Sequence, residues 1–362
     1  MKRLELLDYG RFFAALMVVA FHYTFNGIVN GKINSINHIP SVIEVTKYGY
    51  LGVELFFMIS GYVIFFSAKN RTAAMFAESR AIRLYPAYWF AILFTSFFAL
   101  QWGGDLMSVY PGQIVANFTM VQSLVGIDNV DGVYWTLVYE ISFYFAVFIL
   151  LFFGLQKHLE TIFVYWPFLF CIALVFGLQS KPYLGGYYYY FAAGALFASI
   201  ANRFNRKAVV SLMVTYAFCI NFSAGKAAHL SDVKGVEYSG LVIALIVTSF
   251  FAIFIYQNSK NGRLVSLPMS RIAGALTYPV YLIHAHFGYM FINRFATEEN
   301  KIVIYAVTVS IVLIAALSLH LIVEKHFHFV WKKLFYYTVS CPINYFQRFQ
   351  KKFQVRYQNP MS

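Results

Sequence analysis

Long runs of apolar residues, separated by short polar segments, recur along almost the whole chain. A helix needs about 20 apolar residues to cross the hydrocarbon core of a bilayer, and about ten runs approach that length. They fall near residues 11–29, 51–68, 84–101, 134–153, 161–177, 187–201, 208–222, 239–257, 272–293 and 302–323. The pattern predicts an all-α, polytopic membrane protein of about ten transmembrane helices, of which the sixth and seventh are short.

The basic residues predict an orientation for these helices. With the N-terminus placed in the cytoplasm, the cytoplasmic segments carry 20 Lys and Arg and the segments on the opposite side carry 7. Basic residues concentrate in the cytoplasmic loops of membrane proteins, so both termini are expected in the cytoplasm. Residues 1–324 are expected to form one transmembrane domain, followed by a basic, aromatic tail at 325–362 on the cytoplasmic membrane surface.

The composition indicates that lipid is the solvent of this chain. Hydrophobic residues make up 60% of the sequence and charged residues 12%, whereas a soluble domain has about a quarter charged residues. The net charge of +13 would suggest nucleic acid in a soluble protein. Because most basic residues flank apolar runs, membrane lipids are the expected partner instead, with no nucleic acid. Cys171, Cys219 and Cys341 form no CxxC pair, so neither a disulfide framework nor a metal site is predicted.

An arginine and a histidine share one face of the first predicted span. Arg11 and His22 are eleven residues apart, which on an α-helix is within about 20° of three full turns, with a rise of about 16 Å. Alone, Arg11 equally fits a snorkelling anchor and His22 a histidine bonded to another helix. As a pair they fit a ligand with an anionic end at the cytoplasmic edge and a reactive end beside the imidazole, which transfers protons near neutral pH.

Carboxylates and further arginines enter other spans. Glu54, expected at the depth of His22, and Glu140 are candidate partners that orient the imidazole, because a neighbouring carboxylate fixes its tautomer. Either is equally compatible with an interfacial or structural carboxylate. Arg80 and Arg83 share a helical face at the cytoplasmic end of the third span. They suit the binding of a phosphate group, or they anchor the helix as positive-inside residues.

Several polar and aromatic residues carry weaker signals. His284 follows Pro279, which frees a backbone carbonyl in its span, so a structural histidine is as compatible as a functional one. Ser60 precedes a glycine, a pattern that helix packing explains equally well. The candidate substrate-binding residues are Ser60, Trp135, Tyr139, Tyr281 and His284.

Five short motifs, in order along the chain, resemble the acyltransferase-3 family of membrane acyltransferases. They are Arg11 with His22, Gly52-Val53-Glu54-Leu55-Phe56-Phe57, Arg80-Ala81-Ile82-Arg83, Trp135-Thr136-Leu137 up to Glu140, and Tyr278-Pro279-Val280-Tyr281-Leu282-Ile283-His284. The resemblance runs from Leu4 to about Glu324. Two positions depart from it, since many relatives have Asp in place of Glu54 and Ser in place of Thr136.

The resemblance implies an enzyme that acylates sugars across a bacterial cytoplasmic (inner) membrane. Its donor is a cytoplasmic acyl-CoA, expected to be acetyl-CoA, which acts as a co-substrate and not as a permanently bound cofactor. Its acceptor is a glycan or a lipid-linked sugar on the far side. His22 would be the catalytic residue, with Glu54 and Glu140 as partners. The phosphate-rich end of the donor would bind to Arg11, Arg80 and Arg83.

Some alternatives stay open. Direct transfer with His22 as general base is expected, and an acyl-histidine intermediate is the alternative. Many relatives carry a hydrolase-like domain after the last span, and none follows here, so the membrane domain is expected to act alone or with envelope-polysaccharide assembly proteins. A proton-coupled transporter also uses intramembrane Glu and His, although no inverted repeat is visible. A structural component of an envelope-polysaccharide machine would tolerate loss of both Arg11 and His22.

Overall fold

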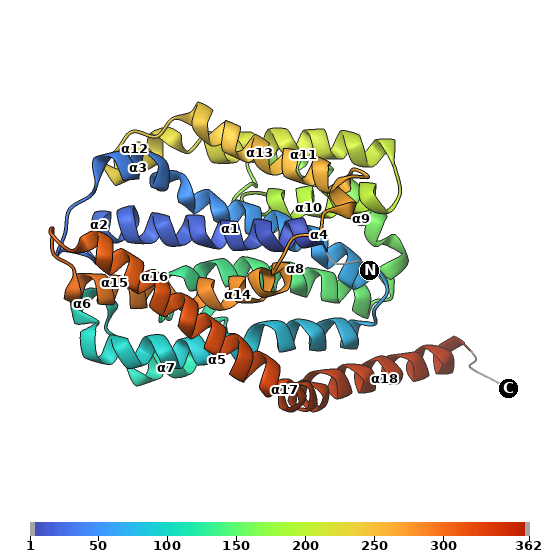
Figure 1. Cartoon of the computed structure of the whole chain (residues 1–362). Coiled ribbons are helices and arrows are strands. Elements are labelled where there is room, and N and C mark those ends of the chain that lie inside the picture. Colours follow the sequence, from blue (N-terminus) through green and yellow to red (C-terminus); the bar gives the residue numbers. More distant parts are fainter. Residues whose placement is uncertain (1–3, 359–362) are drawn as a thin grey trace.

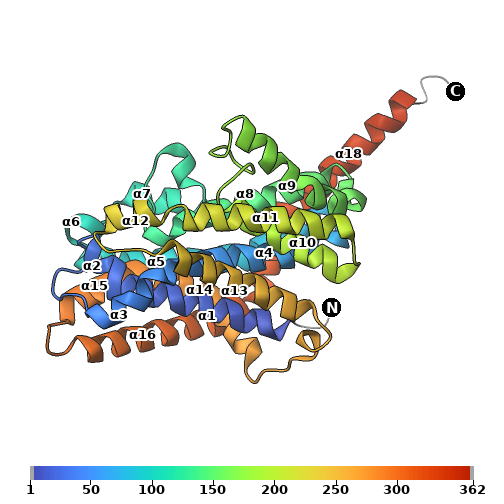
Figure 2. The ribbon, with the colours of Figure 1, turned by 90° about the horizontal axis from the view of Figure 1, so that it is seen from above.

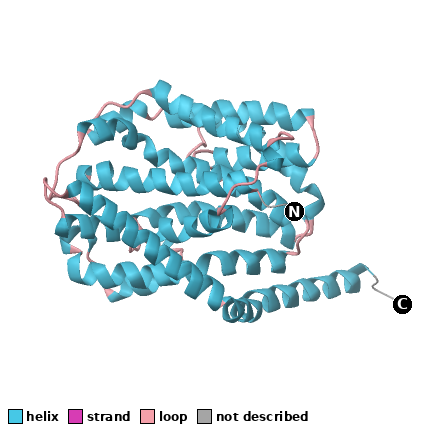
Figure 3. Ribbon diagram, in the orientation of Figure 1, coloured by secondary structure: helices cyan, strands magenta, loops and turns pink. Residues whose placement is uncertain are grey.

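The computed structural model describes residues 4–358, and within that range every regular element is a helix (Figure 3). The long helices run side by side in one bundle (Figures 1 and 2). They are α1 (Glu5–Phe21), α4 (Gly52–Lys69), α5 (Ala73–Trp102), α8 (Trp135–Phe152), α9 (Leu159–Val175), α10 (Tyr188–Asn202), α11 (Arg206–Ala224), α13 (Gly240–Asn258), α14 (Ser270–Ile283), α15 (Ala285–Phe295) and α16 (Lys301–Ser318). Each predicted span corresponds to one of these helices or, for 272–293, to the pair α14 and α15.

Within residues 4–358, eight helical segments are long and apolar enough to cross a membrane by length and composition, which confirms a polytopic membrane protein. Helix α10 has 15 residues and is therefore about 22 Å long, shorter than the ~30 Å hydrocarbon core. The predicted span 272–293 is interrupted, because α14 ends at Ile283 and α15 begins at Ala285. Pro279 lies inside α14 and cannot donate a backbone hydrogen bond there.

Short helices cover the end of the bundle opposite to the start of α1 (Figure 1). These are α2 (Gly27–Val29), α3 (Pro40–Thr46), α6 (Gly104–Met107), α7 (Pro111–Asn117) and α12 (Ala227–Lys234). At the C-terminal end, α16 continues through a π-helical segment at Leu319–His326 into α17 (His328–Phe335) and α18 (Cys341–Gln358). Helix α18 projects beyond the bundle, toward the end at which α1 begins (Figure 2).

Helices α4 and α10 pack with their backbones in contact. A Cβ atom added to Gly194 of α10 would lie 1.9 Å from the carbonyl oxygen of Met58, and one added to Gly61 of α4 would lie 2.1 Å from the carbonyl oxygen of Phe191. Small residues allow such close approach between membrane helices. This contact fixes α4, and with it the polar residues that α4 presents on its other faces.

We expect Gly194→Ala to destabilise the protein. The methyl group has no space beside α4, so the helices must separate, and overpacking of this kind costs about 1–3 kcal/mol or more. Thermal unfolding in detergent would show a lower melting temperature. Gly240→Ala is the matched control, because its nearest neighbour is an ordinary 3.5 Å away. Equal melting temperatures for the two variants would contradict the close packing of α4 and α10.

Candidate functional site

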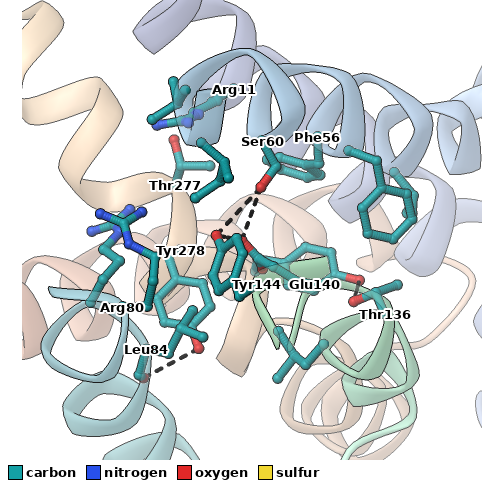
Figure 4. A pocket seen from close by; sticks show the side chains of 17 residues that line it. Arg11, Phe56, Ser60, Arg80, Leu84, Thr136, Glu140, Tyr144, Thr277 and Tyr278 are labelled. Carbon is teal, nitrogen blue, oxygen red and sulfur yellow. Dashed lines mark hydrogen bonds between the residues drawn. The ribbon is translucent and has the colours of Figure 1, made fainter. Parts of the chain in front are cut away.

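A cavity of about 260 Å³ lies between α1, α4, α5, α8 and α14 (Figure 4). Four charged side chains line it: Arg11, Arg80, Arg83 and Glu140. They come from three helices that are distant in sequence, and the sequence analysis singled out all four. We refer to this space as the arginine cavity. Ser60 and Tyr281, two of the predicted substrate-binding residues, also line it.

The two arginines of α5 rest on aromatic rings, one helical turn apart. The Arg80 guanidinium lies 5.7 Å from the ring centre of Tyr144, and that of Arg83 lies 5.5 Å from the ring centre of Tyr278. Arg83 also forms a 3.7 Å salt bridge with Glu324 Oε1. Glu324 belongs to the π-helical segment that follows α16. These contacts hold both guanidinium groups at the wall of the cavity, where they can reach an anionic ligand.

Arg11 differs from the other two arginines. It enters the cavity from α1, beside Thr277 of α14 (Figure 4). Within residues 4–358, no hydrogen bond or salt bridge reaches its guanidinium group. A guanidinium group offers five donors in a planar fork. The donors of Arg11 are therefore available to a ligand that carries phosphate or carboxylate oxygens.

Among the described residues, Glu140 is the single carboxylate in the lining of the arginine cavity. Its Oε1 accepts hydrogen bonds from the Tyr144 hydroxyl and, at 3.4 Å, from the Ser60 hydroxyl (Figure 4). One carboxylate against three guanidinium groups leaves the cavity with a net positive charge. Such a lining attracts an anionic ligand and raises its local concentration.

His22 lies close to the arginine cavity but does not line it. The α-helical geometry of α1 changes at this residue to a π-helical turn, His22–Asn26, a feature that is frequent at functional sites. The imidazole ring packs edge-on against His284, with ring centres 5.1 Å apart. Two further ring contacts, His284 with Tyr281 at 5.7 Å and Tyr281 with Phe56 at 5.5 Å, connect it to the cavity wall.

The predicted shared face of α1 points toward α14. Arg11 lies opposite Thr277, with which it lines the cavity, and His22 contacts His284, two helical turns further along α14. Both side chains are therefore on the side of α1 that packs against α14. Phe56 and Tyr281 line the cavity together with Arg11, whereas His22 does not line it, which the helical periodicity did not indicate.

The hydrogen-bond partner of His22 is a tyrosine. His22 Nδ1 forms a hydrogen bond with the hydroxyl group of Tyr289 on α15. That hydroxyl group also accepts from Asn26 Nδ2 at 3.1 Å, and Asn26 Oδ1 accepts from Lys234 Nζ at 2.7 Å. Because Lys234 can only donate, it holds the Asn26 amide with its NH₂ group toward Tyr289. The chain of contacts fixes both the position and the hydrogen-bonding role of Tyr289.

His284 has an unused nitrogen atom. Its Nδ1 lies 2.8 Å from the carbonyl oxygen of Tyr281, and because a carbonyl can only accept, Nδ1 carries the proton. Its Nε2 is then an acceptor, and it is buried without a partner in residues 4–358. Buried polar atoms are rarely left unpaired. This atom is therefore a candidate acceptor for a substrate hydroxyl group near His22.

A second polar cluster borders Tyr289. The Lys32 ammonium group lies 2.7 Å from His286 Nε2 and 5.9 Å from the ring centre of Tyr289. The backbone N–H of His286 donates to Asp131 Oδ2 at 2.9 Å. Burial lowers the pKa of Lys32, and the Asp131 carboxylate opposes that shift. Charged groups thus surround the histidine pair on the side of the short helices.

Neither predicted carboxylate contacts His22. Glu140 lies in the arginine cavity, and Glu54 is 1% exposed and turned toward the region of α10 and α11. Glu54 interacts electrostatically with Lys226 and Tyr187, and its Oε2 has no hydrogen-bond partner in the described chain. The group that holds His22 is Tyr289, which sequence reasoning missed. It is one of 28 tyrosines, and no charge or motif distinguished it.

The last two predicted substrate-binding residues lie outside the arginine cavity. Trp135 and Tyr139 are on the opposite side of α8 from Glu140 and line a separate groove with Tyr187. The sequence predicted that both residues lie in the span 134–153, which became α8. It did not predict that they line a different space from the arginines.

Comparison with known proteins gives one match. A family model, acyltransferase-3, described as an acyltransferase domain, matches residues 4–323. No curated protein and no solved structure matches the chain. The matched range covers the helices that form the arginine cavity and those that hold His22.

Proposed function

The chain belongs to the acyltransferase-3 family, and we propose that it transfers an acyl group from cytoplasmic acyl-CoA to a sugar hydroxyl on the other side of the membrane. The acceptor is a glycan or a lipid-linked sugar, the acyl group is acetyl, and the membrane is the bacterial inner membrane. The observation that carries the proposal is a cavity with three guanidinium groups close to a histidine pair.

The donor binds with its phosphates at the arginine cavity. Arg11 supplies unused donors, while Arg80 and Arg83 extend the positive lining along one turn of α5. Guanidinium groups bind phosphate through pairs of parallel hydrogen bonds. The pantetheine arm then extends along α14, past Phe56 and Tyr281, so that its thioester lies beside His22. The distance of about 16 Å between the two positions on α1 suits a ligand with separate anionic and reactive ends.

His22 acts as the general base. Its Nδ1 forms a hydrogen bond with the Tyr289 hydroxyl group, which also accepts from Asn26, and the general-base role requires the tautomer with the proton on Nδ1 and the lone pair on Nε2. The sugar hydroxyl oxygen attacks the thioester carbonyl carbon while Nε2 takes the hydroxyl proton. A carbon–oxygen bond forms, the carbon–sulfur bond breaks, and the proton passes from His22 to the thiolate of CoA. General-base catalysis contributes about 10²- to 10⁴-fold.

The two carboxylates have other roles in this scheme. Glu140 balances part of the positive charge in the arginine cavity and positions Tyr144 and Ser60 through hydrogen bonds. Glu54 does not line the arginine cavity, and we propose that it acts near the sugar acceptor. His284 offers its free Nε2 as an acceptor to a second hydroxyl group of the sugar.

The test is acyl transfer by the purified protein in vesicles. We expect label from [acetyl-¹⁴C]acetyl-CoA to appear in oligosaccharides released from the envelope polysaccharide of the source cells. Mass spectrometry of the envelope glycans should show acetyl groups in cells with the protein that are missing from cells without it. Proton-driven solute uptake by the vesicles without any transfer of label would contradict the proposal and favour a transporter.

A further inference from the structure

We propose that the groove between α8, the 176–187 connection and the end of α11 is the binding site for the sugar acceptor. The inference rests on the proposed function and gives its second substrate a place. The groove has a volume of about 870 Å³ and is lined mainly by aromatic rings and by polar side chains. The residues that carry the argument are Trp135, Tyr139, Tyr187, Asn221, Phe222 and Lys226.

Helix α8 separates this groove from the arginine cavity. Thr136, Leu137 and Glu140 face the cavity, whereas Trp135 and Tyr139 face the groove. The helix therefore presents one face to each space. A donor on one side and an acceptor on the other can thus approach the same centre without competing for the same surface.

Aromatic rings that line the cavity contact aromatic rings that line the groove. Phe57 lines the arginine cavity, and its ring centre is 5.4 Å from that of Tyr187 and 6.0 Å from that of Tyr139, both of which line the groove. Phe56, the neighbour of Phe57 in α4, contacts Tyr281, whose ring contacts His284. The inner end of the groove and the path of the thioester therefore meet at the same part of α4.

A carboxylate and an ammonium group flank this inner end. Lys226 lies with its Nζ 3.3 Å from the ring centre of Phe222 and 5.0 Å from that of Tyr187. Glu54 interacts electrostatically with Lys226 and Tyr187 but forms no salt bridge with the lysine, and its buried Oε2 is unpaired in the described chain. Glu54 is buried and does not line the groove, so its part here is to hold the Lys226 ammonium group at the groove by electrostatic attraction.

The lining fits a sugar better than a lipid chain. Flat rings stack against the C–H face of a pyranose, while amide, hydroxyl and ammonium groups bind its hydroxyls. The groove offers Trp135 and Tyr187 for the first role and Asn221 and Lys226 for the second. By contrast, the hollow between α11 and α13 has almost only aliphatic and aromatic side chains in its lining, as expected of a surface that faces lipid tails.

The test uses Trp135→Ala and Tyr187→Ala, with Tyr165→Ala as matched control. Tyr165 is an exposed aromatic residue in another shallow hollow of the surface. The probes are oligosaccharides released from the envelope polysaccharide of the source cells, with acetyl-CoA as donor. We expect the acceptor KM to rise at least tenfold in both groove variants and the KM for acetyl-CoA to stay unchanged. The control should behave as the wild type.

Direct binding separates this inference from the proposed function. The purified protein without acetyl-CoA should bind the oligosaccharides, and Trp135→Ala should weaken that binding at least tenfold. If binding follows this pattern but neither the wild type nor any variant transfers label, the groove is confirmed as the sugar-binding site and the proposed acyl transfer is contradicted. If the wild type transfers label and the groove variants keep its acceptor KM and binding, the groove inference alone is overturned. Binding of phospholipid in the groove, with none of the oligosaccharides, also overturns it.

Discussion

Replacing His22 with alanine is expected to lower acyl transfer by about 10²- to 10⁴-fold, the usual contribution of a general base. The variant should keep its affinity for acetyl-CoA, because His22 does not line the arginine cavity. It should also fold, since His22 is not among the fully buried residues of the core. Steady-state kinetics with labelled acetyl-CoA, together with a melting curve in detergent, would measure both properties. Activity within tenfold of the wild type would show that His22 is not the general base.

Tyr289→Phe is the matched variant for this prediction. It keeps the aromatic ring and removes only the hydroxyl group that forms the hydrogen bond with His22 Nδ1. We expect a fall in kcat of about fivefold, in line with the ~1 kcal/mol of a typical hydrogen bond, and an unchanged KM for acetyl-CoA. A kcat equal to that of the wild type would mean that the imidazole does not need this partner. A fall as large as that of His22→Ala would give Tyr289 a direct part in the chemistry.

Arg11→Ala is expected to raise the KM for acetyl-CoA by about 10- to 100-fold with little change in kcat. A hydrogen bond to a charged group contributes about 1.5–3 kcal/mol, and tenfold in affinity corresponds to about 1.4 kcal/mol. Arg11 should show the larger effect because its guanidinium group forms no salt bridge or hydrogen bond within residues 4–358, whereas that of Arg83 is paired with Glu324. Initial rates over a range of acetyl-CoA concentrations would give both constants.

Arg83→Ala provides the comparison for Arg11. This arginine already pairs with Glu324 and packs on Tyr278, so part of its charge is balanced before the donor arrives. Its loss should also raise the KM for acetyl-CoA, but by a smaller factor than the loss of Arg11. Donor KM values that match the wild type in both variants would show that the phosphates bind elsewhere.

The helices were predictable because each apolar run is a local property of the sequence. The run at 239–257 became α13 (Gly240–Asn258), and the run at 51–68 became α4 (Gly52–Lys69). A helix satisfies its backbone hydrogen bonds within itself, so its position in lipid follows from its own residues. The interruption at His284 was less visible, because Pro279 indicated a kink but not its extent.

The charged residues of the site were also recognisable one by one. A charge inside an apolar span is unfavourable by at least ~2.5–3.5 kcal/mol and therefore marks a position with a partner or a role. Arg11, Arg80, Arg83 and Glu140 were each identified in this way, and the structure gathers them in one cavity. The partner of His22 was not identifiable, since Tyr289 is uncharged and lies 267 positions away in the sequence.

The sequence by itself determined the helical membrane architecture, the family, and the face of α1 that carries Arg11 and His22, because all three depend on local spacing and composition. Only the tertiary structure decided which side chains meet. It placed Tyr289, and neither Glu54 nor Glu140, in hydrogen-bond contact with His22, and it put Phe56 and Tyr281 in the wall of the cavity that the arginines line. Contacts between helices depend on how each helix is rotated and packed, as at Gly61 and Gly194, and no local pattern in the chain encodes that rotation.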